Sequence, residues 1–163
     1  MFSFFHILFF IEYKCSVMNM KLEKRDYKKL LIYIAIPLLL GGLVGFLTRG
    51  GTSNYDSIVP GYVFPIVWSI LYILMGISSY LIRDNERLLN IYKINLVFNF
   101  LWPFVFFSLD LKTLAFFWIL LLIVIVGIMI YEFYKENKLS AYLLIPYLFW
   151  LIFASILNLM AII

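Results

Sequence analysis

The chain has 163 residues, of which 65% are hydrophobic and 13% are charged, and its formal net charge is +4. Soluble chains are typically about 45–50% hydrophobic and about 25% charged. This composition excludes a water-soluble domain and indicates an integral membrane protein, because a soluble fold could not hide so much apolar surface. One cysteine (Cys15) and one histidine (His6) exclude an internal disulfide and a Cys/His zinc cluster.

The N-terminus is a short hydrophobic extension. The apolar run in residues 1–13 is too short to cross a bilayer, and no positively charged region precedes it. A degenerate signal segment and an interfacial segment are both open interpretations. We expect residues 1–19 to lie outside the working protein, with Met18 and Met20 as alternative starts, and residues 20–163 to form one membrane domain. The only histidine and cysteine then carry no function.

Five apolar segments follow, each long enough to cross a bilayer as a helix of about 20 residues. They are Leu30–Leu47, Pro60–Ile82, Tyr92–Leu109, Thr113–Tyr134 and Ser140–Ile163. Within these limits the only charged side chains are Lys93 and Glu132, both close to the end of a segment. The sequence therefore predicts an all-α fold, a bundle of five transmembrane helices.

Positive charge alternates between the connections of the predicted helices. One side carries eleven lysines and arginines: Lys14, Lys21, Lys24, Arg25, Lys28, Lys29, Arg83, Arg87, Lys93, Lys135 and Lys138. The other side carries two, Arg49 and Lys112. The positive-inside rule then predicts a multi-pass protein of the cell membrane with a cytoplasmic N-terminus and an external C-terminus. Because the net charge is explained by topology, we expect no nucleic-acid partner.

Polar and aromatic residues recur at helical spacing inside three of the predicted helices. They form the stripes Pro65, Trp68, Tyr72, Met75 and Ser79; Asn95, Asn99, Trp102 and Phe106; and Pro146, Trp150, Ala154 and Asn158. At a rise of about 1.5 Å per residue, Trp68 lies roughly 12 Å and Trp150 about 14 Å from the nearer end of its helix. Tryptophans of an aromatic belt would lie at the headgroups instead.

These stripes have two interpretations. In one, the asparagine amides join neighbouring helices, each contact contributing about 0.6 kcal/mol to stability, and the prolines only bend their helices. In the other, the asparagines and tryptophans line a cavity for a flat, mostly apolar ligand. Similarly, Gly41 and Gly45 form a GxxxG pair that suits either internal packing or a dimer face. Spacing alone leaves both pairs of alternatives open.

Three of the segments carry longer motifs. The second helix reads P-G-x-V-F-P-x-V-W-x-x-L-Y-x-x-M-G from Pro60 to Gly76. The third contains N-x-x-W-x-x-x-F-F, formed by Asn99, Trp102, Phe106 and Phe107. The fifth contains P-Y-x-x-W-x-x-x-A-x-x-x-N, formed by Pro146, Tyr147, Trp150, Ala154 and Asn158. Together, between about Pro37 and Asn158, they resemble the tryptophan-rich sensory protein family, whose animal members are the mitochondrial translocator proteins.

This resemblance implies a five-helix bundle, commonly a homodimer, that binds porphyrins, haem precursors, sterols or synthetic benzodiazepine-site ligands among its helices. The ligand-binding residues that it implies are Trp68, Tyr72, Asn95, Asn99, Trp102, Pro146, Trp150 and Ala154, with Tyr55 from the first loop, which covers the pocket. This first loop is shorter between Tyr55 and Pro60 than the family's usual lid. The C-terminal LNLMAII lacks the aromatic-then-basic tail of the family's cholesterol-recognition motif, so a sterol is the least expected ligand.

We therefore expect a membrane receptor or transporter for porphyrins, haem precursors or similar planar apolar ligands, with membrane lipids and a second copy of the chain as partners and no required cofactor. One alternative is an enzyme that degrades porphyrin in light and oxygen through its pocket tryptophans, as has been proposed for the family. The predicted helices contain no His, Cys or central carboxylate for ordinary acid–base or nucleophilic catalysis. The other alternative is a structural or partner-binding membrane protein.

Overall fold

The computed structural model describes residues 24–52 and 59–163, which form long helices joined by short connections. These are α2 (Lys24–Thr52), α3 (Val63–Leu81), α4 (Glu86–Pro103), α5 (Lys112–Glu136) and α6 (Lys138–Met160), with a π-helix, η1 (Phe104–Ser108), directly after α4. All five long helices are long and apolar enough to cross a membrane. The predicted all-α bundle of five spans is confirmed, whereas the prediction for residues 1–19 falls outside the described residues.

Several helices extend beyond the predicted spans. Helix α2 is longer at both ends than Leu30–Leu47, and α4 begins at Glu86 rather than at Tyr92. Asn85 starts α4, because its side-chain oxygen accepts a hydrogen bond of 3.2 Å from the backbone N–H of Leu88. Hydrophobicity predicts which part of a helix can lie in the membrane, whereas capping groups decide where the helix begins and ends.

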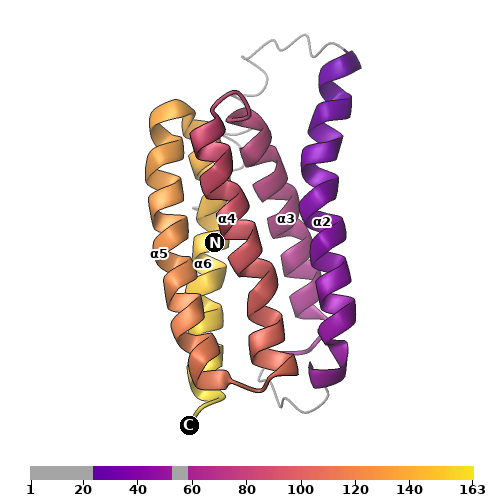
Figure 1. Cartoon of the computed structure of the whole chain (residues 1–163), viewed down its shortest axis with the longest axis vertical. Helices are drawn as coiled ribbons and strands as arrows, with labels where there is room; N and C mark the ends of the chain where they lie inside the picture. Colours follow the sequence, from indigo (N-terminus) through magenta and orange to yellow (C-terminus); the bar gives the residue numbers. More distant parts are fainter. Residues whose placement is uncertain (1–23, 53–58) are drawn as a thin grey trace, which may run out of the picture.

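The helices form a closed ring, in which some helices that pack together are not consecutive in the sequence. Helix α2 packs against α3, α3 against α6, α6 against α5, and α5 against α4. The ring closes where α4 and η1 contact α2. Successive helices run in opposite directions, so the connections lie alternately at the two ends of the bundle (Figure 1).

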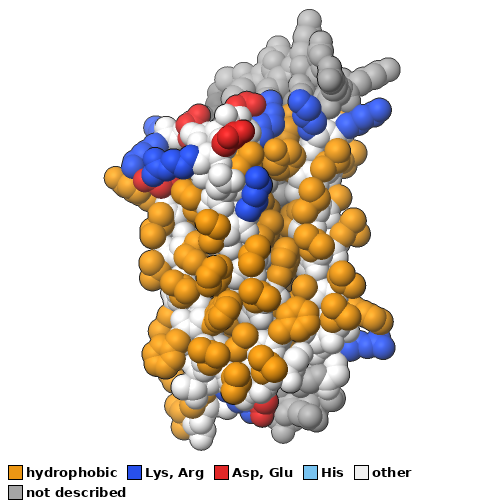
Figure 2. All heavy atoms as spheres, viewed as in Figure 1, with side chains coloured by type: hydrophobic (Ala, Val, Ile, Leu, Met, Phe, Trp, Pro, Cys, Tyr) orange, Lys and Arg blue, Asp and Glu red, His pale blue; other side chains and the backbone are white. Residues whose placement is uncertain are grey.

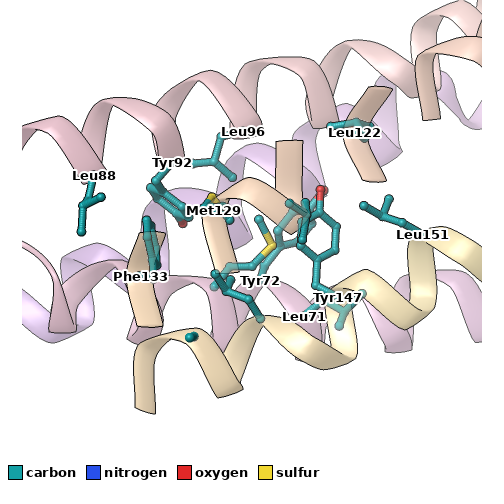
Figure 3. Close-up of a cluster of buried hydrophobic side chains, with 14 of the residues drawn as sticks. Leu71, Tyr72, Leu88, Tyr92, Leu96, Leu122, Met129, Phe133, Tyr147 and Leu151 are labelled. Carbon is teal, nitrogen blue, oxygen red and sulfur yellow. The ribbon is translucent and has the colours of Figure 1, made fainter. Parts of the chain in front are cut away.

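The hydrophobic core lies among four of the five long helices. Figure 3 shows Leu71 and Tyr72 of α3, Met129 of α5 and Tyr147 of α6 directed into this shared interior. Met75, Met129 and Phe133 are completely inaccessible to solvent. Among the α2 residues whose burial the structure describes, none belongs to the fully buried part of this core, although Leu38 packs against its edge. Helix α2 therefore closes the ring without filling its interior.

The outer surface of the bundle is apolar along its middle. Figure 2 shows a broad area of hydrophobic side chains between two charged ends. Large apolar side chains are exposed on every long helix, including Leu39, Ile66, Val97, Phe117 and Phe149. A surface of this kind is stable in lipid, where its contact with acyl chains replaces contact with water.

Two close approaches fix the position of α3. On one side, a side chain added at Gly76 would overlap the backbone of Tyr33 and Ile34, so α2 and α3 nearly touch there. On the other side, the buried hydroxyls of Ser78 and Ser140 lie 2.8 Å apart, and each also donates to the other residue's carbonyl oxygen. Small residues allow such approaches between membrane helices.

Candidate ligand-binding site

A cavity of about 810 Å³ lies between α2, α3, α4 and η1. It begins beside Tyr72 and Asn99, reaches Arg49 near the end of α2, and is also bounded by the chain around Pro60 that leads into α3. Its lining is mostly aromatic, aliphatic and glycine. Small-molecule sites are typically about 300–1,000 Å³ and mostly apolar with a few polar groups, and this cavity has both properties.

The cavity exists because α2 presents small residues toward the ring. Gly41, Gly42 and Gly45 all line it. A side chain added at Gly41 would overlap the Tyr72 ring, whereas one added at Gly42 or Gly45 would meet no atom within 4 Å. Gly41 is therefore used for close packing and Gly45 for open space. Internal packing is therefore found at Gly41, whereas a dimer face that includes Gly45 stays a prediction.

Trp68, Tyr72 and Trp102 line the cavity, and each of them stacks on another aromatic ring. The rings of Trp68 and Tyr72 are stacked, with centroids 5.4 Å apart and planes inclined by 29°. Trp102 stacks on Phe106 of η1, with centroids 5.1 Å apart and planes inclined by 19°. The Trp102 indole N–H donates to the carbonyl oxygen of Ala115 over 3.1 Å, which fixes the ring against α5. These held rings offer a flat apolar ligand a large contact area.

The polar end of the cavity is a hydrogen-bonded chain of three buried side chains. The Tyr72 hydroxyl donates to Asn99 Oδ1, and Asn99 Nδ2 donates to the Tyr147 hydroxyl, both over 2.9 Å. These bonds join α3, α4 and α6 and fix the orientation of the Asn99 amide. Asn99 thus links neighbouring helices and also lines the cavity, so both interpretations of the stripes apply to this residue.

A recess of about 20 Å³ lies next to the cavity, with room for about one water molecule. Trp150 and Ala154 of α6 line it, together with Trp68, Asn99 and Trp102, which also line the main cavity. The Trp150 indole N–H is buried and has no hydrogen-bond partner among the described residues. A buried unpaired donor favours a ligand or water that supplies an acceptor.

The structure brings six of the nine predicted site residues together. Trp68, Tyr72, Asn99 and Trp102 line the main cavity, and Trp150 and Ala154 line the recess.

Asn95 and Pro146 line neither space. Asn95 lies one helical turn before Asn99 and is completely buried, and Pro146 lies inside α6 directly before Tyr147. Tyr55 lies outside the described residues.

Sequence reasoning missed the contribution of α2. Gly45, Phe46 and Arg49 line the cavity, yet none was predicted as a site residue. A signal was present, because Gly41, Gly45 and Arg49 recur at intervals of four and so share one helix face. Tyr147 was noted only as part of a motif, and its hydrogen bond to Asn99 depends on how α4 and α6 pack. Among the described residues, no group of three or more His, Cys, Asp or Glu side chains could hold a metal ion.

The sequence matches the TspO/MBR family over residues 33–163. It is 32% identical to the tryptophan-rich protein TspO of Archaeoglobus fulgidus over 142 residues, which cover 80% of this chain and 92% of that protein. It is 30% identical to the tryptophan-rich sensory protein of Cereibacter sphaeroides, over 61% of this chain and 65% of that protein. It is 34% identical to the human translocator protein, over 61% and 63% respectively. The chain is therefore a member of the TspO/MBR family of integral membrane proteins.

Proposed function

We propose that this protein is a membrane receptor or transporter that binds porphyrins, haem precursors or similar planar apolar molecules in the cavity between α2, α3 and α4. The observation that carries the proposal is the cavity of about 810 Å³, with the stacked Trp68–Tyr72 pair in its wall and Asn99 at its polar end. Flat aromatic walls give contact area to a planar ligand, and a few fixed polar groups orient it.

A cavity-filling substitution tests this proposal. In Gly45→Leu, the new side chain enters open space, so the helices need not move. We expect its affinity for protoporphyrin IX, measured by tryptophan quenching in detergent, to fall at least about tenfold, because the leucine occupies volume that the ligand needs.

Gly127→Leu is the matched control. Gly127 lies on α5, an added side chain there also meets no atom within 4 Å, and it does not line the cavity. This variant should bind like the unsubstituted protein. Thermal unfolding of both variants checks that they are folded. Unchanged affinity in a folded Gly45→Leu protein would show that the porphyrin does not bind in this cavity.

The proposal includes a cytoplasmic N-terminus, with the protein in the cell membrane. Among the described residues, Arg83, Arg87, Lys135 and Lys138 lie around the α3–α4 and α5–α6 connections at one end of the bundle. Figure 2 shows most of the lysine and arginine side chains of the visible face gathered at that end. This distribution supports a cytoplasmic position for that end.

A homodimer also belongs to the proposal. Cross-linking of the purified protein in detergent tests it, since a single band at the monomer mass would contradict a dimer. Because Gly41 packs against Tyr72 within the protomer, we expect the dimer contact not to include Gly41.

A further inference from the structure

Tyr92 and Asn95 are buried polar residues of α4 that lie outside the ligand cavity and its recess. Asn95 is completely inaccessible to solvent, and Tyr92 is only 5% exposed. Neither the two amide atoms of Asn95 nor the Tyr92 hydroxyl has a hydrogen-bond partner among the described residues. A buried polar group without a partner costs free energy, and surrounding lipid offers no replacement for the missing bond.

Polar groups of two other helices lie close to this pair. The Tyr147 hydroxyl of α6 lies near the Asn95 amide, and the Ser79 hydroxyl of α3 lies near the Tyr92 hydroxyl, in neither case with the geometry of a hydrogen bond. Both of these neighbours are completely buried. Figure 3 shows Tyr92 and Tyr147 directed from α4 and α6 into the same interior. A bridging water molecule commonly completes polar contacts that are not direct hydrogen bonds.

We infer that the bundle binds an ordered water molecule between α3, α4 and α6, and that this water joins Asn95 to Tyr92. Buried water typically makes about three hydrogen bonds to polar groups that otherwise have no partner. A third bond is available from either neighbour. The Tyr147 hydroxyl accepts from Asn99 and still has its own proton to donate. The Ser79 hydroxyl donates to a carbonyl oxygen of its own helix and can still accept.

The surroundings of the site favour water over a larger or charged ligand. Met75 and Met129 belong to the same buried cluster as Tyr92 and are completely inaccessible to solvent, so the interior is closely packed here. Among the described residues, none of the buried side chains is charged, and an ion would lose its hydration without a compensating charge. The inference therefore does not depend on which ligand binds in the cavity.

The bound water lengthens the hydrogen-bonded chain that begins at the ligand cavity. That chain runs from Tyr72 through Asn99 to Tyr147. Asn95 and Tyr92 precede Asn99 by four and seven residues. At a rise of about 1.5 Å per residue, the chain continues about 6 Å to Asn95 and about 10 Å to Tyr92 along α4. The water thus joins three helices of the ring at a level beyond the cavity.

A crystal structure of the full chain in a lipid phase, at a resolution that shows ordered water, tests the inference directly. We expect electron density at about 2.7–3.2 Å from an amide atom of Asn95 and from the Tyr92 hydroxyl. Absence of this density, with the Asn95 amide bonded directly to protein groups, would overturn the inference.

Denaturant unfolding in detergent gives an independent test. Asn95→Leu removes both amide atoms with little change in size, and Tyr92→Phe removes only the hydroxyl. If one water serves both groups, its loss in the first variant leaves the second substitution little to remove. The unfolding midpoint of the double variant should therefore fall by clearly less than the sum of the two single shifts. Additive shifts would contradict a shared water.

Asn158→Leu is the matched control. Asn158 is 1% exposed, and its amide atoms also have no partner among the described residues, but it lies near the end of α6, in the opposite half of the bundle from Tyr92. Combined with Tyr92→Phe, it should shift the midpoint by the sum of the single shifts. An equal deficit in both pairs would show that the coupling does not come from a water at Asn95. If Asn95→Leu does not fold, the crystal structure of the unsubstituted protein decides.

Discussion

Gly41 of α2 lies directly against the ring of Tyr72 on α3, so closely that a methyl group added to the glycine would overlap the ring. The Tyr72 hydroxyl donates to Asn99 on α4 over 2.9 Å. A glycine on the helix that contributes least to the core thus fixes a tyrosine at the polar end of the cavity. Helix packing and the shape of the cavity therefore depend on the same contact.

The Gly41→Ala variant should be destabilised. Its added methyl group must displace the Tyr72 ring, and overpacking of this kind costs about 1–3 kcal/mol of unfolding free energy. Thermal unfolding in detergent measures the change. Gly42→Ala is the control, because its methyl group enters open space and the gain in helix propensity is worth about 0.5–1 kcal/mol. Equal unfolding temperatures for the two variants would contradict a tight Gly41–Tyr72 contact.

Removal of the Asn99 amide alone should lower the free energy of unfolding more than removal of all three hydrogen-bonding groups of Tyr72, Asn99 and Tyr147. Asn99→Leu leaves the buried hydroxyls of Tyr72 and Tyr147 without this partner, and an unsatisfied buried group costs about 1–3 kcal/mol. The triple variant Tyr72→Phe, Asn99→Leu and Tyr147→Phe has no such group, so we expect it to be more stable than Asn99→Leu alone. Denaturant unfolding in detergent measures both. A triple variant as unstable as the sum of its parts would show that the three side chains act independently.

Two tryptophans with different hydrogen bonding should respond in opposite ways to substitution by phenylalanine. The indole N–H of Trp118 donates to the Phe98 carbonyl oxygen over 2.9 Å and joins α5 to α4, but Trp118 does not line the cavity or the recess. Trp118→Phe should therefore lower the unfolding temperature and leave porphyrin affinity unchanged.

Trp150→Phe should do the reverse. The Trp150 N–H is buried without a partner among the described residues, so its loss should cost little stability, whereas the recess beside the cavity changes shape. We expect weaker porphyrin binding with nearly unchanged thermal unfolding. If both tryptophan variants changed affinity alike, the recess would have no special role in binding.

The orientation in the membrane can be read from cysteine labelling. In a Cys15→Ser background, Asp84→Cys places a thiol in the α3–α4 connection and Leu111→Cys places one at the start of α5, at the opposite end. Both positions are exposed. A membrane-impermeant maleimide applied to intact cells should label Leu111→Cys only, and permeabilised cells should show both. Labelling of Asp84→Cys alone in intact cells would reverse the proposed orientation.

The sequence predicted which residues form the stripes on α3, α4 and α6. It predicted less accurately which residues of other helices lie next to these stripes. Trp68, Asn99 and Trp150 were selected because they recur at helical spacing far inside apolar segments, and all three line the cavity or its recess. Asn95 shows the same spacing, yet it lies outside both spaces. Periodicity predicts the face of a helix on which a residue lies. Which turns of that face line a cavity depends on how the neighbouring helices pack against it.

The membrane class, the five helical spans, the asymmetry of charge between the two ends and the family could all be predicted from the amino-acid sequence. Hydrophobicity, charge and helical spacing are properties of consecutive residues, so they can be read without any knowledge of packing.

Three features become visible only in the folded bundle. The glycine face of α2 leaves the cavity open, Asn99 joins Tyr72 to Tyr147, and Arg49 lies at the cavity. These features depend on the order of the helices around the ring, in which α3 lies beside α6 and α2 beside α4. That order is set by the mutual packing of side chains distant in sequence, which no single segment specifies.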